Sequence, residues 1–353
     1  MDNQNEKIPI AILGATGTVG QRFIQLLFDH SWFEITALCG SERSAGQKYG
    51  DVCQWQLEGC IPPSIAEMVV GSPEPPLPAR LIFSALPSSV AKEIEPIFAK
   101  DGYVLCSNAS AYRQDPNVPL IIPEINPEHL GVIKGQRKYK GWKGLIVTSP
   151  NCTTTGVVMP LKPLDQAFGL KSVIAVSMQA VSGAGYPGLS YLDIIDNVIP
   201  YIRGEEEKIE QETRLLLGKI EGKSRVQSEA VVSAQCNRVP VLDGHTACLS
   251  VELSEKPGVE ELVQVLKDFR SPPTVKPLPS MPEYPIIVRE EPDRPQPRRD
   301  RNAMEGMAVS VGRIRPCNLF DFRMVSVVHN TLRGAASGAI LNAELLVSEG
   351  YLS

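Results

Sequence analysis

The sequence predicts an α/β fold, with a doubly wound parallel sheet in the first half of the chain and a second, α+β domain after it. Three observations support this prediction. The 353 residues are more than one typical domain needs, and 43% of them are hydrophobic, which is enough for two packed cores. The chain starts with an apolar strand, a glycine-rich turn and a helix. Short apolar strands then alternate with helical segments as far as residue 150, which is typical of parallel sheets.

Composition and charge argue against several classes of protein. A net charge of −5 and the lack of a large basic block disfavour nucleic-acid binding. No apolar run approaches the length of a membrane span and the N-terminus is polar, so we expect a cytoplasmic protein that does not associate with membranes. The eight cysteines are irregularly spaced, so we expect reduced thiols, although a loop could bring Cys53 and Cys60 together. His245, Cys248 and Cys236 lack the paired Cys-x-x-Cys spacing of a zinc site, and we expect no bound metal.

The first strand, at residues 8–13, leads into the turn Gly14-Ala15-Thr16-Gly17-Thr18-Val19-Gly20 and then into a helix that ends near His30. In Rossmann-like domains such glycines let the main chain approach a pyrophosphate, and the N-terminus of the helix faces its charge. The spacing G-x-x-G-x-x-G is less specific than G-x-G-x-x-G, so a turn without a ligand remains the alternative. We expect a bound dinucleotide.

The end of the second strand, at residues 33–38, indicates which dinucleotide is bound. An enzyme that uses NAD usually has an acid at this strand end to hold the ribose 2′-hydroxyl. Here Ser41, Arg43 and Ser44 offer hydroxyls and a guanidinium, which suit the 2′-phosphate of NADP. Glu42 lies among them and could be that acid, so NAD remains the alternative. We expect NADP.

The alternation continues through two more strands and a helix as far as residue 105. The loop at 106–113, which contains Asn108 and Arg113, lies beyond the carboxyl end of a strand, where open α/β sheets bind ligands. Arg113 could hold an anion there or be a solvated loop residue, and the loop alone does not decide between the two.

Cys152 is predicted to lie at the start of a helix. The β-branched run at 145–148 has the pattern of a buried strand, Pro150 ends it, and the apolar spacing after residue 156 suits a helix face. Unpaired N–H groups and the positive end of the helix dipole favour an anion at this position. We therefore expect the pKa of the Cys152 thiol to fall from about 8.5 toward neutrality, and the same N–H groups to hold an oxyanion. A small core cysteine in a turn is the alternative.

A polar helix is predicted at residues 205–220 in the second half of the chain. Glu205, Lys208 and Glu212 fall on one of its faces, at spacings that bring neighbouring side chains together. Such a face is usually a solvated row of ion pairs.

Arg238 and His245 flank a predicted turn. In an unbroken strand these two residues would face opposite ways, because seven positions separate them. Asp243-Gly244 is a strong turn signal, and a turn there could bring both side chains into one pocket. His245 is the best placed of the four histidines for proton transfer near neutral pH.

The other segments of the second half follow ordinary patterns. Residues 271–301 are rich in proline and charge and are expected to be an irregular excursion on the surface. Residues 330–346 are predicted to be a helix rich in small residues, which could pack closely against the first domain. The remaining predictions are alternating apolar runs at 170–181 that include Gln179, a glycine-rich loop at 182–188, strands at 230–234, 246–253, 308–313 and 322–328, and a helix at 258–269.

Several separate stretches together resemble one family, the aspartate-β-semialdehyde dehydrogenases of the archaeal and fungal-type branch, over essentially the whole chain. Each motif is weak alone, and their joint presence in this order is specific. The motifs are Gly14-Ala15-Thr16-Gly17-Thr18-Val19-Gly20, Ser41-Glu42-Arg43-Ser44, Ser149-Pro150-Asn151-Cys152-Thr153-Thr154, Ser182-Gly183-Ala184-Gly185, Gly204-Glu205-Glu206-Glu207-Lys208, Arg238-Val239-Pro240, Gly244-His245-Thr246 and the run from His329 to Ala336.

The resemblance implies the NADP-dependent, reversible conversion of L-aspartate 4-semialdehyde and phosphate into L-aspartyl 4-phosphate, which serves lysine, methionine and threonine synthesis. Cys152 would attack the acyl carbon and form a thioester, and His245 would be the general acid and base. The implied substrate ligands are Arg238 for the α-carboxylate, Glu205 for the α-ammonium, Lys208, Arg113 and Asn108 for the phosphate, and Gln179 for orientation. The implied cofactor ligands are Gly14, Thr16, Gly17, Thr18, Val19, Ser41, Arg43, Ser44, Ser84, Ser182, Gly183 and Asn330.

The resemblance also implies an architecture. The NADP-binding domain would comprise residues 1–150 and 330–353, because the C-terminal helix would return to it, and residues 151–329 would form the catalytic and dimerisation domain of a homodimer or homotetramer. The proline- and arginine-rich run at 293–301 has no clear counterpart in the family pattern.

Two alternative functions remain open. A malonyl-CoA or succinyl-CoA reductase shares this fold and both the cysteine and the histidine, but a CoA thioester needs no ammonium partner, so Glu205 and Lys208 favour the amino-acid substrate. A non-catalytic dinucleotide sensor would be expected to have lost Cys152 or His245, and the chain has both.

Overall fold

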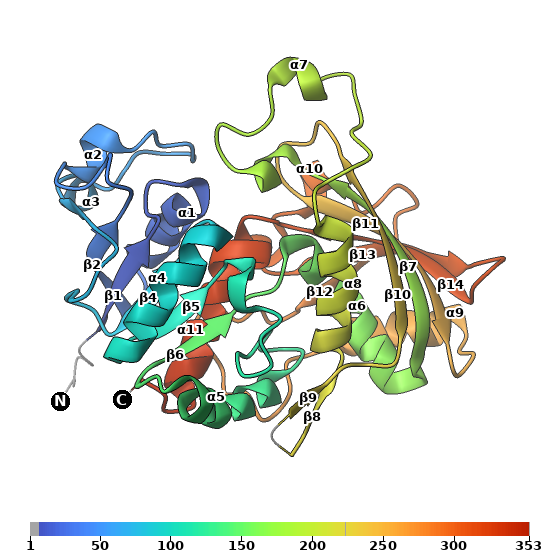
Figure 1. Cartoon of the computed structure of the whole chain (residues 1–353). Coiled ribbons are helices and arrows are strands. Elements are labelled where there is room, and N and C mark those ends of the chain that lie inside the picture. The colour runs from blue at the N-terminus through green and yellow to red at the C-terminus, as the bar shows by residue number, and fades with distance from the viewer. Residues whose placement is uncertain (1–6, 223, 353) are drawn as a thin grey trace, which may run out of the picture.

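The computed structural model describes residues 7–222 and 224–352, which form two six-stranded sheets. Figure 1 shows one sheet in each half of the molecule. Buried hydrophobic side chains cover both faces of the first sheet and one face of the second. None of the described helices is long and apolar enough to cross a membrane.

The first sheet is wholly parallel, with the strand order β3-β2-β1-β4-β5-β6. Its strands are β1 Ile8–Leu13, β2 Phe33–Cys39, β3 Val70–Gly71, β4 Leu81–Ser84, β5 Val104–Ser107 and β6 Leu145–Thr148. Because β1 lies between β2 and β4, the direction of winding reverses there, and ligands of such sheets bind beyond the carboxyl ends of the strands at that point. The predicted doubly wound sheet is confirmed.

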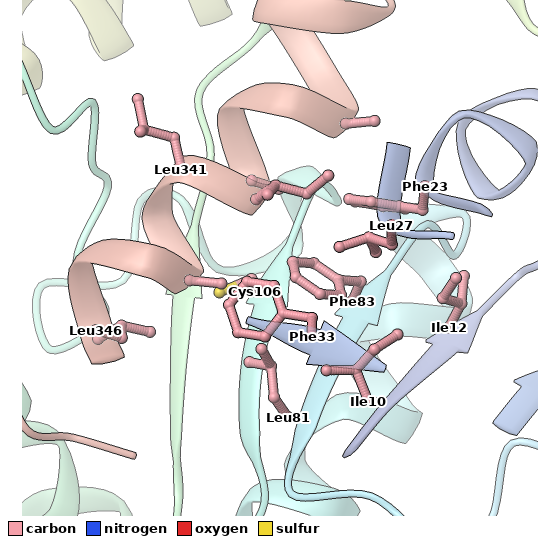
Figure 2. Close-up of a cluster of buried hydrophobic side chains, with 14 of the residues drawn as sticks. Ile10, Ile12, Phe23, Leu27, Phe33, Leu81, Phe83, Cys106, Leu341 and Leu346 are labelled. Carbon is pink, nitrogen blue, oxygen red and sulfur yellow. The ribbon is translucent and has the colours of Figure 1, made fainter. Parts of the chain in front are cut away.

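The C-terminal helix packs on the first sheet. Figure 2 shows Leu341 and Leu346 of this helix beside Phe33, Phe83 and Cys106, and all of them belong to one buried cluster. The segment expected as one helix at 330–346 begins with a π-helical turn, η5 Leu332–Ala336, and continues as α11 Ser337–Ser348. The other helices and short turns of this half are α1 Thr18–Leu27, α2 Tyr49–Val52, α3 Pro63–Ala66, α4 Ser88–Asp101, η1 Ser110–Tyr112, η2 Pro127–Val132 and α5 Ile133–Lys140.

The second sheet is mixed, with the strand order β10-β7-β11-β14-β13-β12. Its strands are β7 Leu170–Gln179, β10 Val231–Arg238, β11 His245–Leu253, β12 Ile286–Arg289, β13 Val309–Pro316 and β14 Phe322–Val328. Helix α6 Cys152–Phe168 buries its apolar side chains, Val157, Leu161 and Leu164 among them, against one face of this sheet. The remaining elements are η3 Val181–Ala184, α7 Tyr191–Ile194, α8 Glu205–Leu216, β8 Lys219–Glu221, β9 Ser224–Val226, α9 Val259–Asp268, α10 Pro297–Asp300 and η4 Ala303–Gly306.

Two predictions about the second half are wrong in part. Helix α8 ends at Leu216 rather than at residue 220, because the chain turns at Gly218, where a Cβ would lie 2.2 Å from the carbonyl oxygen of Val226. The segment 271–301 is not an irregular surface excursion throughout. It contributes the edge strand β12 and helix α10, and it buries Leu278 and Asp300. Charged side chains can be buried when they pair with one another, and composition alone does not reveal that pairing.

Candidate active site

Cys152 is the first residue of α6, directly after the loop that leaves β6. Asn151 caps the helix, and its Oδ1 accepts hydrogen bonds from the main-chain N–H groups of Thr153 (2.8 Å) and Thr154 (3.1 Å). The π-helical turn lies close behind the cysteine, because a Cβ on Gly334 would come within 2.7 Å of the Cys152 Cβ. Only glycine fits this approach, so the thiol is held in place by both a cap and a backing surface.

His245 is the first residue of β11 and the direct partner of Cys152. The Cys152 Sγ and the His245 Nε2 are 3.2 Å apart. On the other side of the ring, Nδ1 accepts a hydrogen bond of 3.0 Å from the main-chain N–H of Ala180. Because Nδ1 is an acceptor, the neutral ring carries its proton on Nε2 and donates it toward the sulfur.

Burial keeps both members of this pair neutral. Burial, and then the positive charge of Arg238, lower the pKa of His245 to about 3. Burial, and then the negative charge of Glu205, raise the pKa of Cys152 to about 12. The expected fall of this pKa toward neutrality is therefore wrong, because the helix N-terminus and two arginines oppose the desolvation of the thiol without overcoming it.

Arg238 lies beside His245, although seven positions separate them in the sequence. It is the last residue of β10, and its Nη1 donates a 2.7 Å hydrogen bond to the carbonyl oxygen of Ala180. A Cβ on Gly183 would lie 2.9 Å from the Arg238 Nη1 and 3.0 Å from the His245 Cε1. The turn at 243–244 thus brings both side chains to one place, as the sequence suggested.

Gln179 is paired with Arg238 across strands β7 and β10 and is buried. Its Nε2 lies 3.2 Å from the Ser177 Oγ and 3.7 Å from the Cys236 Sγ. Within the residues that the structure describes, its side chain makes no hydrogen bond to Cys152 or His245. Gln179 is therefore the neighbour of Arg238 on the adjacent strand of the sheet.

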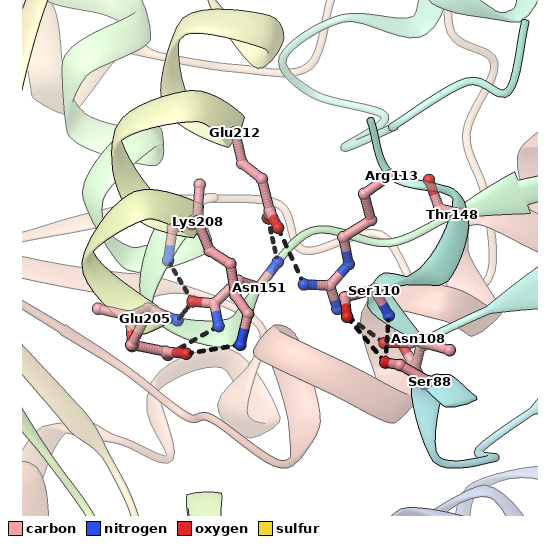
Figure 3. Close-up of polar contacts among 12 residues, drawn as sticks. Ser88, Asn108, Ser110, Arg113, Thr148, Asn151, Glu205, Lys208 and Glu212 are labelled. Atoms are coloured by element: carbon pink, nitrogen blue, oxygen red, sulfur yellow. Dashed lines mark hydrogen bonds and ion pairs between the residues drawn. The ribbon is translucent and has the colours of Figure 1, made fainter. Parts of the chain in front are cut away.

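Glu205 is the first residue of α8 and is buried beside the start of α6 (Figure 3). Its Oε1 accepts a 2.7 Å hydrogen bond from the Asn151 Nδ2, and its Oε2 lies 3.3 Å from the Lys208 Nζ. The lysine side chain is 37% exposed, so its ammonium faces the solvent-accessible side of the pair.

Glu212, two turns along α8, is buried, and the prediction of a solvated row of ion pairs is wrong for it. Its Oε1 pairs with the Arg113 Nη1 at 3.0 Å, and its Oε2 accepts a 2.6 Å hydrogen bond from the main-chain N–H of Asn151. The Arg113 Nη2 in turn donates to the carbonyl oxygen of Asn108 at 2.7 Å. Figure 3 shows Glu212 pointing from α8 toward Arg113 and Asn151. Sequence analysis did not assign a role to Asn151 or Glu212, although an asparagine directly before a predicted helix is a capping signal.

The glycine turn after β1 has the shape that a pyrophosphate requires. Gly14 has a φ of +75°, and a Cβ there would lie 2.8 Å from the carbonyl oxygen of Ala85. A Cβ on Gly20 would lie 2.2 Å from the carbonyl oxygen of Gly14. Helix α1 starts after Gly17 with no side-chain cap and no acid in its first turn, so its N–H groups at Thr18 and Val19 face the loop. The turn, which includes Thr16, fits a dinucleotide.

The predicted ligands of the 2′-phosphate lie in the turn after β2. Ser41 and Arg43 are exposed, and Ser44 is buried with its hydroxyl donating to the carbonyl oxygen of Ser41 at 3.0 Å. Ser84 ends β4, directly beside the last residue of β1. These positions surround the carboxyl ends of the two central strands.

A cavity of about 370 Å³ lies between the start of α1 and the loop that follows β7. Thr18 lines it on the first domain's side, and Ser182 and Leu242 line it on the other. Asn330 holds the loop after β7 next to the turn before β11, because its Nδ2 donates to the Ser182 Oγ (2.8 Å) and its Oδ1 accepts from the N–H of Gly244 (2.8 Å). Ser182 lines the cavity, and its neighbour Gly183 lies against His245 and Arg238.

Two family models match the chain. Residues 9–133 match "Semialdehyde dehydrogenase, NAD binding domain", and residues 161–333 match "Semialdehyde dehydrogenase, dimerisation domain".

Curated relatives match along nearly their whole length. An aspartate-semialdehyde dehydrogenase from Archaeoglobus fulgidus is 51% identical over 96% of this chain and 98% of its own length. One from Schizosaccharomyces pombe is 48% identical over 97% of this chain and 99% of its own. Among solved structures, an aspartate-semialdehyde dehydrogenase with NADP from Candida albicans superposes with a TM-score of 0.90 at 42% identity, covering 98% of this chain and 100% of that one.

Proposed function

The chain belongs to the aspartate-semialdehyde dehydrogenase family, and we propose that it catalyses the reversible, NADPH-dependent conversion of L-aspartyl 4-phosphate into L-aspartate 4-semialdehyde and phosphate. The observation that carries this proposal is the pair of Cys152 and His245, 3.2 Å apart at the start of a helix, with Arg238 beside them. A nucleophile, a proton donor and a carboxylate ligand thus converge beside Gly183, whose neighbour Ser182 lines the cavity.

The chemistry starts at the sulfur of Cys152. Its thiolate attacks the acyl carbon, a C–S bond forms, and the C–O bond to phosphate breaks to leave a thioester. NADPH, when bound, supplies the hydride that reduces this thioester. His245 then donates the proton on Nε2 to the oxyanion at the same carbon and takes it back when the hemithioacetal collapses. In that collapse the C=O bond re-forms, the C–S bond breaks, and the aldehyde leaves with the sulfur as thiolate.

The charged groups around Cys152 match the charges of an amino-acid substrate. Arg238, anchored through Nη1, offers the other edge of its guanidinium to the α-carboxylate, and Gln179 supports it from below. Glu205 takes the α-ammonium, and Lys208 is thereby released toward the phosphate, which Arg113 and Asn108 also face. Substrate binding would also neutralise Glu205 and so remove a charge that raises the pKa of Cys152, which favours the thiolate when it is needed.

The cofactor is NADP, and the chain offers a site for it in two parts. Gly14, Gly17 and Thr18 of the glycine turn would hold the pyrophosphate. Ser41, Arg43 and Ser44 would hold the 2′-phosphate, and Ser182 and Gly183 would receive the nicotinamide end.

Replacing Arg43 tests the choice of cofactor. Arg43→Ala should raise the KM for NADP by about one to two decades, the worth of a charge-assisted hydrogen bond, and should change the KM for NAD little. The control is Lys48→Ala, because Lys48 is exposed. Arg22→Ala would not serve, because Arg22 lines the cavity. If Arg43→Ala changed the KM for NADP and the KM for NAD equally, Glu42 would be the residue that recognises the ribose.

We further propose that the protein works as a homodimer or homotetramer through its dimerisation domain, with residues 1–150 and 330–353 as the NADP-binding domain and 151–329 as the catalytic one. The packing of α11 on the first sheet supports this division. The cytoplasmic location expected from the sequence stays a prediction.

One pair of assays tests the substrate. The protein is given NADP, phosphate and aspartate semialdehyde in one assay, and NADPH with malonyl-CoA or succinyl-CoA in the other. We expect turnover of the semialdehyde to be faster than that of either thioester. A faster reaction with a CoA thioester would overturn the substrate and leave the roles of Cys152 and His245 standing, whereas no reaction in either assay would favour the dinucleotide sensor.

A further inference from the structure

The proline- and arginine-rich segment at 294–301 is organised around one buried carboxylate. Asp300, at the end of α10, is fully buried. It accepts hydrogen bonds from the Arg294 Nε (2.7 Å) and the main-chain N–H of Gln296 (2.6 Å), and it forms an ion pair of 2.9 Å with the Arg289 Nε. A buried carboxylate with these partners fixes the segment in one conformation.

This segment lies against the turn that leads into His245. The Arg301 Nη1 donates a 2.9 Å hydrogen bond to the carbonyl oxygen of Asp243. Gly244 has a φ of +100°, and a Cβ there would lie 3.0 Å from the Pro297 Cβ and 3.3 Å from the Arg301 Cβ. The main-chain N–H of Gly244 is bonded on its other side, to Asn330. The two residues before His245 are therefore held from two directions.

We propose that Arg301, fixed by the Asp300 cluster, is a positioning residue that holds the Asp243–Gly244 turn and so keeps the His245 ring between Ala180 and Cys152. This inference rests on the proposed function. The ring is held by one main-chain hydrogen bond at Nδ1, and its Nε2 must stay 3.2 Å from the sulfur. A displacement of about 1 Å at a reacting group can cost a factor of about 10² in rate, so a turn that drifted would cost turnover.

The variant that tests the proposal is Arg301→Met, which keeps the length of the stem that packs on Gly244 but donates no hydrogen bond. We expect kcat to fall about tenfold, with KM values for aspartate semialdehyde and NADP within about twofold of wild type, because no substrate contact is lost. Arg301→Lys keeps a donor and should recover most of the lost kcat. The matched control is Arg298→Met, because Arg298 lies on the same short helix, is exposed and has no side-chain partner in the described part of the chain.

A double-mutant cycle separates positioning of His245 from general loosening of the fold. If Arg301 acts through His245, Arg301→Met should cost less than about twofold in a His245→Asn background, since the group that it positions is already gone. An equal loss in both backgrounds would overturn the proposal, and so would wild-type kcat in Arg301→Met. If Arg301→Met does not fold, the same cycle is measured with Arg301→Leu.

A readout that needs no substrate keeps this proposal distinguishable from the proposed function. Protein labelled with ¹⁵N-histidine should show His245 as the Nε2–H tautomer, identified by its loss in His245→Asn. In Arg301→Met the signal should shift toward a mixture of tautomers, because the ring leaves the Ala180 N–H. An unchanged tautomer in Arg301→Met would overturn the positioning role of Arg301 even if the enzyme is active. An altered tautomer in a protein with no dehydrogenase activity would support the positioning role and reject the proposed function.

Discussion

The two sides of Cys152 are built differently. On one side, His245 and Arg238 are both anchored to the main chain of a single residue, Ala180, through its N–H and its carbonyl oxygen. On the other side, the carboxylate of Glu205 is held by side chains, those of Asn151 and Lys208. Groups held by the main chain cannot exchange that partner without moving a strand, whereas groups held by side chains can.

This difference separates the groups whose geometry must stay fixed from a group that must exchange its partner. A proton donor must keep its geometry through the reaction, which favours a rigid anchor. A ligand for the substrate's ammonium must be paired when the substrate is absent and free to pair with it on arrival, which favours a mobile partner such as the 37% exposed Lys208. Arg113, the other proposed phosphate ligand, differs from Lys208, because Arg113 and its partner Glu212 are almost fully buried and removing one of them would cost about 3–5 kcal/mol.

The largest effect on kcat is expected at Cys152, where the two sides meet. Cys152→Ser should lower kcat by at least about 10³-fold, because the hydroxyl is a far weaker nucleophile than a thiolate. NADP binding, measured by fluorescence titration, should stay within about twofold. The control is Cys60→Ser, since Cys60 is an exposed free cysteine. Retention of more than a tenth of wild-type kcat in Cys152→Ser would remove the cysteine from the mechanism.

A smaller effect is expected from Arg238→Lys on the main-chain side. The lysine keeps the charge but lacks the planar fork that reaches both Ala180 and a carboxylate, so kcat/KM for aspartate semialdehyde should fall about 10²-fold. His245→Asn should instead lower kcat with little change in KM, because it removes a proton donor and no substrate ligand. Steady-state kinetics of the two variants side by side check this. If kcat/KM of Arg238→Lys stayed within tenfold of the wild-type value, the positive charge of Arg238 would matter and its bidentate geometry would not.

Local patterns predicted the parts of this site that neighbouring residues determine. The glycine turn, the strand before it and the helix after it lie within one short stretch, and so do Pro150 and Cys152. The turn at Asp243-Gly244 was likewise visible. The sequence did not reveal that Glu212 is buried, because its partner Arg113 is 99 positions away. For the same reason the charge of Asp300 suggested a surface loop, although Arg289 and Arg294 neutralise it inside the protein.

The pKa of Cys152 shows the same limit. A cysteine at a helix N-terminus predicts a lowered pKa, and the local geometry is as predicted. The result is the opposite, because burial depends on the whole fold and Glu205 arrives from another helix. A correct local prediction therefore led to a wrong electrostatic one.

The smallest effect tests the side-chain side of the comparison without any substrate. Glu205→Gln removes the negative charge that, after burial, raises the pKa of Cys152, so the pKa should fall and the thiolate fraction at a given pH should rise. Alkylation of Cys152 by iodoacetamide at pH 8, followed by mass spectrometry, should become roughly three- to tenfold faster, in line with a charge at moderate distance in a partly screened site.

In wild type the rate should keep rising up to pH 9 without a plateau, because that range lies below a pKa of about 12. The matched control is Glu207→Gln, which makes the same charge change on the same helical turn. Glu207 is exposed, and its side chain has no hydrogen bond or ion pair in the part of the chain that the structure describes. If both variants sped alkylation equally, the effect would come from net charge, and if neither did, burial alone would set the pKa and Glu205 could not couple substrate binding to formation of the thiolate.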